Sequence, residues 1–145
     1  MAYMTGTYSA KVDEKGRLFV PARLREDLGS VFYVTIGTHE GRKCLTVYTK
    51  ESWERLNERF QALPLSQQFS RLGKIFQNAV ECVPDKQFRF LLTPKLFRYA
   101  GITKDVVITG ISGVAQIWDA AAYEQYELET DDSEDLLDAM EAIRI

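Results

Sequence analysis

Cysteine and histidine are scarce in this chain of 145 residues. Cys44 and Cys82 stand alone, outside any C-x-x-C motif, and His39 is the one histidine. Disulfide frameworks and the common zinc sites need several such residues at short spacing. We therefore interpret both cysteines as ordinary strand residues and expect no metal and no cofactor.

Signatures of catalysis are absent as well. The sequence has no nucleophile elbow, no phosphate-binding loop and no cluster of metal ligands. The paired acids Asp13 and Glu14 fall in a predicted turn, where burial is not expected to raise a pKa for acid–base work. We therefore expect a protein that is not an enzyme, with no catalytic residue and no small-molecule substrate.

Long apolar runs are missing too. No segment approaches the roughly 20 apolar residues that a membrane span needs. The first eleven residues, Met1 to Lys11, lack the basic and apolar regions of a signal peptide. We therefore expect a cytoplasmic protein with no membrane partner.

The net charge of −3 hides an uneven distribution. Residues 127–145 hold eight acids and one base, which leaves 17 bases and 13 acids, a net of +4, in residues 1–126. A mildly basic body with an acidic tail fits a protein that binds an anion such as nucleic acid. A near-neutral globule with a solvated tail fits the charge equally well.

A repeat is the main signal of the sequence. The two copies occupy residues 13–29 and 85–101. Each copy reads Asp-x-x-x-Arg, an apolar run, a proline, a short basic helix and a glycine. After each glycine the pattern predicts two strands joined by a glycine-containing turn, and then a helix that begins at a capping residue, Thr49 or Asp119.

Each unit is thus predicted as strand, tight turn, strand, short helix, strand, turn, strand, helix. We divide the chain into a first unit (6–60), a connecting helix (61–77), a second unit (78–126) and an acidic tail (127–145). Within the connecting segment we expect one helix over residues 66–77. Its apolar face is interpreted as core rather than as a partner site, and consists of Phe69, Leu72, Ile75 and Phe76.

Asp13 and Arg17 flank the predicted hairpin turn of the first unit, in which Gly16 can adopt a positive φ without steric cost. One interpretation is a structural clamp, since a carboxylate can accept two parallel hydrogen bonds from a guanidinium. The other is that Asp13 orients Arg17, so that Lys15 and Arg17 face a phosphate backbone or a guanine edge. The motif is weak alone, but its near-duplication strengthens it.

These residues resemble the MraZ family of bacterial transcriptional regulators, within the AbrB-like DNA-binding superfamily. The likeness covers about residues 4–126; the segment 12–22 is close to the family's first motif, and the stretch Ala62-Leu63-Pro64-Leu65 is also similar. It implies an α+β fold, namely a β-rich AbrB-like swapped-hairpin barrel made from two tandem pseudo-repeats, with added helices. It also implies a nucleoid-associated homo-oligomeric ring that binds repeated double-stranded DNA boxes upstream of the division and cell-wall gene cluster, often as a repressor.

The DNA-facing motif of that family is Asp-x-x-x-Arg, which occurs twice here. Arg23 and Arg25 of the short helix could add phosphate contacts or form a solvated helix face. The candidate DNA-binding residues are Asp13, Lys15, Arg17, Arg23, Arg25, Asp85, Lys86 and Arg89.

The second copy departs from the pattern at two places. Phe88 takes the position of Gly16, and four residues rather than three separate Arg89 from Pro94. A bulky residue tolerates a positive φ poorly, so we expect the second turn to differ by a bulge or a shifted register. We accordingly expect the first copy to carry most of the DNA recognition.

A protein-interaction module is the alternative interpretation, because AbrB-like domains also occur in antitoxins, whose tails often bind the toxin. The acidic tail could form an amphipathic partner helix with Leu136, Leu137, Met140 and Ile143 on its apolar face. Antitoxins usually carry one AbrB-like unit, however, and this chain carries two.

Overall fold

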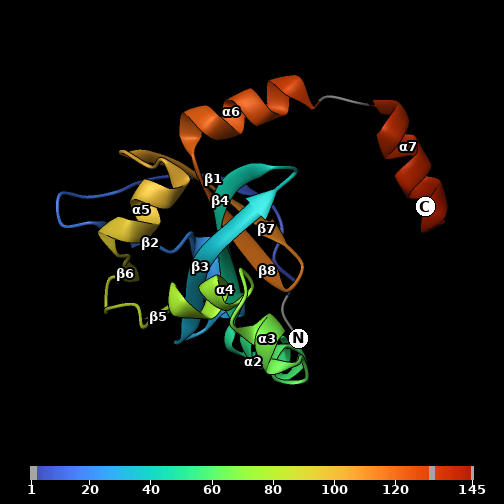
Figure 1. Cartoon of the computed structure of the whole chain (residues 1–145). Coiled ribbons are helices and arrows are strands. Elements are labelled where there is room, and N and C mark those ends of the chain that lie inside the picture. Colours follow the sequence, from blue (N-terminus) through green and yellow to red (C-terminus); the bar gives the residue numbers. More distant parts are fainter. Residues whose placement is uncertain (1–2, 131–132, 145) are drawn as a thin grey trace.

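A computed structural model describes residues 3–130 and 133–144 (Figure 1). Within these ranges, six strands form one sheet in the order β1-β7-β8-β4-β3-β5, and two further strands, β2 and β6, form a separate ribbon. All neighbouring strands run antiparallel. The expected α+β class is therefore confirmed.

The elements follow one another as the repeat predicts. Those of the first half are β1 (Thr7–Lys11), β2 (Arg17–Phe19), η1 (Ala22–Leu24), α1 (Arg25–Leu28), β3 (Phe32–His39), β4 (Arg42–Thr49) and α2 (Lys50–Gln61). Two short helices connect the halves, α3 (Leu65–Gln68) and α4 (Gly73–Gln77). Those of the second half are β5 (Val80–Cys82), β6 (Arg89–Leu91), α5 (Pro94–Ala100), β7 (Asp105–Ile111), β8 (Val114–Asp119), α6 (Ala120–Glu129) and α7 (Ser133–Ala142).

The two halves exchange their first strands. β1 pairs with β7 of the second half, with Thr7 opposite Thr109, and β5 pairs with β3 of the first half, with Cys82 opposite Phe32. The prediction of a hairpin across residues 13–16 is wrong in this respect. β1 and β2 flank that turn, but each pairs with a strand of the other half.

The β2–β6 ribbon is where equivalent segments of the two copies meet. Its registered pairs are Arg17 with Leu91, Leu18 with Phe90, and Phe19 with Arg89. Side chains alternate between the two faces of a strand, so the middle pair shares one face and the outer pairs share the other. Leu18 and Phe90 are buried, which makes theirs the inner face.

Buried positions of the first copy recur 72 residues later (90 − 18). The equivalent pairs are Leu18 and Phe90, Val20 and Leu92, Leu24 and Leu96, and Leu28 and Ala100. Pro21 and Thr93 are also equivalent, as the N-caps of η1 and α5. The additional residue before Pro94 is therefore no insertion, because the proline has moved by one position.

The connecting segment is not the single helix that we expected over residues 66–77. α3 ends at Gln68 and α4 begins at Gly73, where a Cβ would lie 2.4 Å from the backbone oxygen of Gln68. This close approach requires glycine and accompanies the reversal of the chain. The predicted core face is correspondingly split: Phe69 is 81% exposed, whereas Phe76 packs against Phe60 of α2 with a centroid separation of 4.3 Å.

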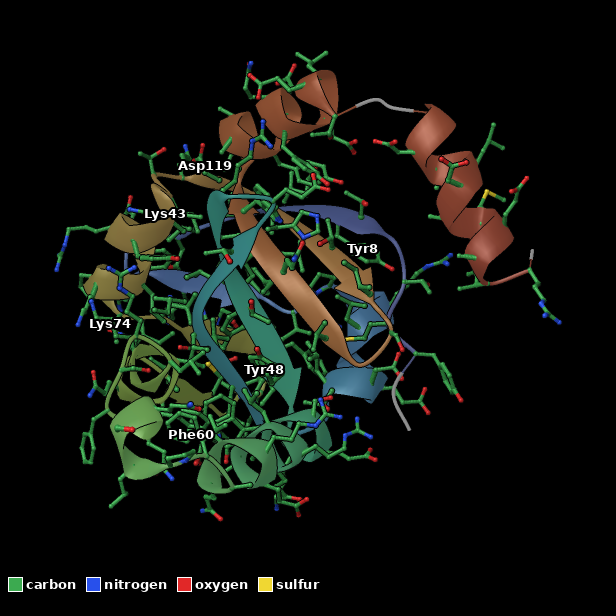
Figure 2. All side chains as sticks on the ribbon, turned by 45° about the vertical axis from the view of Figure 1, so that its right-hand side comes forward. Tyr8, Lys43, Tyr48, Phe60, Lys74 and Asp119 are labelled. Carbon is green, nitrogen blue, oxygen red and sulfur yellow. The ribbon has the colours of Figure 1, made fainter. Side chains whose placement is uncertain are left out.

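The predicted helix caps are confirmed. Thr49 accepts a hydrogen bond from the backbone N–H of Ser52 at the start of α2, and Asp119 accepts one from Ala122 at the start of α6. Figure 2 shows Asp119 at the junction of β8 with α6 and Phe60 among the helices at the opposite end of the sheet. The helices thus cap both ends of the sheet and leave the side with the ribbon and its turns uncovered by α2 and α6 (Figure 1).

One hydrophobic core joins the two halves. Phe32 of the sheet and Phe90 of the ribbon meet edge to face, with ring centroids 5.1 Å apart. Leu18, Leu45 and Ile117 are fully buried in the same cluster. Because both halves supply these side chains, the inner face of the ribbon packs against a core that the two halves form together.

The acidic tail contributes the end of α6 and the helix α7, which stands apart from the sheet in Figure 1. Leu136, Leu137 and Ile143 of the tail are each at least 60% exposed. Asp131 and Asp132, two of the eight acids of the tail, lie outside the described residues. No helix of the described ranges is long and apolar enough to cross a membrane.

Candidate nucleic-acid interface

The turn before β2 is built around the carboxylate of Asp13. Its Oδ1 accepts hydrogen bonds from the backbone N–H groups of Lys15 and Arg17, both at 2.9 Å. Its Oδ2 accepts one from Nε of Arg17 at 2.8 Å. One side chain therefore fixes both the backbone of the turn and the direction of the arginine that follows it.

The turn before β6 repeats this arrangement. Oδ1 of Asp85 accepts from the backbone N–H groups of Gln87 at 2.9 Å and Arg89 at 3.0 Å, and its Oδ2 accepts from Nε of Arg89 at 2.9 Å. The backbone bonds of the two turns also correspond, with Asp13 and Asp85 each donating to the carbonyl of its arginine at 2.9 Å.

The expectation that the second turn differs by a bulge or a shifted register is therefore wrong. Phe88 adopts a φ of 62°, and Gly16 at the equivalent place has a φ of 79°. Phe88 thus accepts the left-handed conformation that its Cβ disfavours.

Hydrogen bonding lowers the pKa of both aspartates. The backbone N–H of Arg17 is the largest cause for Asp13, and that of Arg89 is the largest cause for Asp85; the guanidinium of the same arginine adds to each. Both carboxylates are consequently ionised at neutral pH. Because Asp13 engages only Nε, the terminal nitrogens of Arg17 keep donors for a further acceptor.

The outer face of the ribbon carries both arginines together with two exposed apolar side chains. Phe19 is 49% exposed and Leu91 is 59% exposed, and each lies opposite an arginine of the neighbouring strand. Phe19 and Leu91 were not among the site residues predicted from the sequence. The signal was available, because strict alternation after Arg17 places Phe19 on the outside of a strand whose other face is buried.

The remaining candidates fall in two places. Lys15 and Lys86 are exposed within the turns themselves, and Arg23 is exposed in η1. Arg25 differs from them, because its Nε donates to the carbonyl oxygen of Val20 at 3.0 Å and its guanidinium lies 4.0 Å from the ring centroid of Phe88. Arg25 therefore contacts the second turn, although it belongs to the first copy.

A cleft lies beside each turn. The cleft next to Gly16 has a volume of about 700 Å³ and is lined by Leu91 and Phe97, whereas that next to Phe88 and Arg25 has a volume of about 300 Å³. Phe97 is the equivalent of Arg25, 72 residues later (97 − 25). The two turns share their hydrogen bonds but differ in the side chains that pack behind them.

Comparison with known proteins gives two kinds of match. The family model described as "MraZ protein, putative antitoxin-like" matches this chain twice, over residues 3–74 and 75–142. Curated relatives named transcriptional regulator MraZ come from Heliobacterium modesticaldum (44% identical, covering 83% of this chain and 84% of the relative), Moorella thermoacetica (37%, 91% and 92%) and Desulfitobacterium hafniense (41%, 88% and 89%).

Proposed function

Because this chain belongs to the MraZ family, we propose that it is a sequence-specific transcriptional regulator that binds double-stranded DNA with the outer face of the β2–β6 ribbon and the two turns before these strands. The observation that carries the proposal is the Asp–Arg turn, present twice with matching hydrogen bonds and placed at both ends of one exposed ribbon.

Arginine held in this way suits DNA. Arg17 and Arg89 would direct their terminal nitrogens at the O6 and N7 acceptors of guanine or at phosphate oxygens. Lys15, Lys86 and Arg23 would neutralise phosphates beside them. The exposed rings and methyl groups of Phe19 and Leu91 would contact thymine methyl groups, which are apolar features of the major groove.

The dimensions of the ribbon fit this reading. The major groove admits a two-stranded β-ribbon. Arg17 lies opposite Leu91, two residues from Arg89, so the two arginines are about 7 Å apart along the ribbon, close to two base-pair steps. An approximate two-fold axis through the Leu18–Phe90 pair relates them, which favours a short, nearly palindromic site.

Assembly completes the proposal. A body with a net charge of +4 neutralises few phosphates, so several linked copies on repeated boxes would be needed for tight binding. We therefore propose a homo-oligomeric ring that acts as a repressor of the division and cell-wall gene cluster in the cytoplasm, at the nucleoid. The strand exchange between the halves supports an AbrB-like swapped-hairpin barrel, with unit boundaries near 6–60 and 78–126.

Binding of the purified protein to the DNA upstream of its own gene tests the proposal, with excess competitor DNA present. Arg17→Ala and Arg89→Ala are each expected to lower the affinity by about 5- to 150-fold, the loss of one bidentate base contact. Arg59→Ala, an exposed arginine of α2, is the matched control and should bind like the unmodified protein. Equal affinity of all three variants would exclude the ribbon as the DNA site.

The same experiment compares the two copies. That the first copy carries most of the recognition stays a prediction, in which Arg17→Ala costs more affinity than Arg89→Ala. Loss of binding in Arg89→Ala with binding retained in Arg17→Ala would show that the roles are reversed.

A protein-binding function is the second candidate, favoured by the exposed apolar side chains of α7 and of Ile143 just after it. Leu136, Leu137 and Ile143 would form the contact, with the acidic residues around them selecting a basic partner. A pulldown with the full chain and with a chain ending at residue 130 tests this. Recovery of one stoichiometric partner by the full chain alone, together with no DNA binding at low salt, would favour this function over the first.

A further inference from the structure

We propose that Arg25 is a positioning residue for the second Asp–Arg turn, which holds Phe88 and thereby the backbone of Arg89 without itself contacting DNA. Its consequence for DNA binding rests on the proposed function, whereas its effect on the turn can be measured without DNA.

Three contacts connect Arg25 to the second turn in a closed circuit. Nε of Arg25 donates to the carbonyl oxygen of Val20 at 3.0 Å, and the backbone N–H of Val20 donates to the carbonyl oxygen of Phe88 at 2.8 Å. The guanidinium then returns to Phe88, with its Cζ 4.0 Å from the ring centroid. The guanidinium of Arg25 thus uses Nε for a hydrogen bond to Val20 and stacks its planar face on the ring of Phe88 in the neighbouring turn.

Phe88 requires such support because of its backbone. A φ of 62° places it in the left-handed region, which a residue with a bulky side chain occupies only when its surroundings enforce it. Phe88 is 44% exposed, so burial in the core does not hold it there. Phe88 also directly precedes Arg89, and a change in its φ would move the N–H and Nε groups that Asp85 binds.

The first copy shows the alternative solution. Gly16 adopts a φ of 79° without steric cost, and the residue equivalent to Arg25 is Phe97, whose ring would lie 3.6 Å from a Cβ at Gly16. Glycine provides in the first turn what the Arg25–Phe88 pair provides in the second. The pair therefore compensates for the missing glycine, and Arg25 matters only as long as residue 88 has a side chain.

A double-mutant cycle tests this dependence on residue 88, with binding to the DNA upstream of the gene as the measurement. Arg25→Ala alone is expected to lower the affinity by about 5- to 70-fold, the range for loss of one cation–π contact and one hydrogen bond. In the Phe88→Gly background the same substitution should change the affinity by less than about 2-fold, since glycine needs no support there. A similar loss in both backgrounds, or no loss in either, overturns the proposal.

The salt dependence separates positioning from a phosphate contact. If Arg25 contacted a phosphate, Arg25→Ala would make the negative slope of log K against log salt shallower by about 0.9. If Arg25 is a positioning residue, Arg25→Ala leaves the slope unchanged. Arg25→Lys keeps the charge but loses the planar group that stacks on Phe88, and we expect it to bind as weakly as Arg25→Ala. Binding by Arg25→Lys at the unmodified level would instead assign Arg25 to a phosphate.

Hydrogen exchange reads the turn in the absence of DNA. In Arg25→Ala, the backbone amides of Gln87, Phe88 and Arg89 are expected to exchange faster, while those of Lys15 and Arg17 in the first turn serve as an internal control. Unchanged exchange at all five amides would refute the positioning role even if the chain binds DNA. Faster exchange at residues 87–89 in a chain that binds no DNA would refute the proposed function and leave the Arg25–Phe88 contact standing.

Discussion

The salt dependence of DNA binding gives the sharpest quantitative test of the proposed interface. Five cations are assigned to direct contact in each chain: Lys15, Arg17, Arg23, Lys86 and Arg89. If all five neutralise phosphates, the slope of log K against log salt is about −4.5 for one chain on one box. Raising the salt from 50 to 200 mM would then weaken binding by about 500-fold.

Each arginine of the ribbon can be assigned by the same measurement. If Arg17 binds a phosphate, Arg17→Ala makes the negative slope shallower by about 0.9 and weakens binding to all sequences alike. If Arg17 reads a guanine, the slope changes little and the loss is confined to boxes that carry that guanine. Titrations of a single-box duplex by fluorescence anisotropy at four or more salt concentrations distinguish the two outcomes. A slope near zero for the unmodified protein would refute an electrostatic interface on this face.

Three further predictions concern the ribbon and the tail. Leu18→Ala, at a fully buried position under the turns, should reduce the free energy of unfolding by about 2–5 kcal/mol. Leu91→Ala, on the exposed face, should change the free energy of unfolding by less than about 0.5 kcal/mol. Equal effects of the two substitutions in denaturant melts would contradict the assigned faces. The stabilisation from Asp13 and Asp85 should be constant above the ordinary aspartate pKa of 3.8 and disappear as the pH falls through their lowered pKa values. In acid melts, the difference in stability between the unmodified protein and Asp13→Asn should therefore shrink only below about pH 4. Deletion of residues 127–145, the acidic tail, should raise binding to non-specific DNA if the tail repels it, and unchanged binding to random duplex would exclude that role.

Much of the local structure could be predicted from the sequence because its causes are local. The capping residues Thr49 and Asp119 begin helices, since their side chains satisfy backbone groups a few residues away. The Asp–Arg turn of the first copy was predicted for the same reason, because Asp13 contacts groups within four residues of itself. Such patterns carry their own explanation in a short window of sequence.

The partners of the short strands could not be predicted in this way. β2 and β6 have three residues each, and alternation defines which face of such a strand is buried but not which strand lies beside it. The exchange of β1 and β5 between the halves depends on long-range packing around Phe32 and Phe90. The break between α3 and α4 depends likewise on one close contact, between Gly73 and the carbonyl of Gln68.

The error about the second turn is the most informative, because the rule behind it was sound. Phe does disfavour a positive φ, and the sequence showed no glycine at residue 88. The residue that compensates, Arg25, lies in the other copy and meets Phe88 only because β2 and β6 pair. One copy of a repeat can thus keep the geometry of a turn after losing the glycine that favours its positive φ, provided that a side chain of the other copy supports the residue in its place. In a tandem repeat of this kind, a departure from the motif in one copy is therefore best examined against the side chains of the other copy before the function of that turn is discounted.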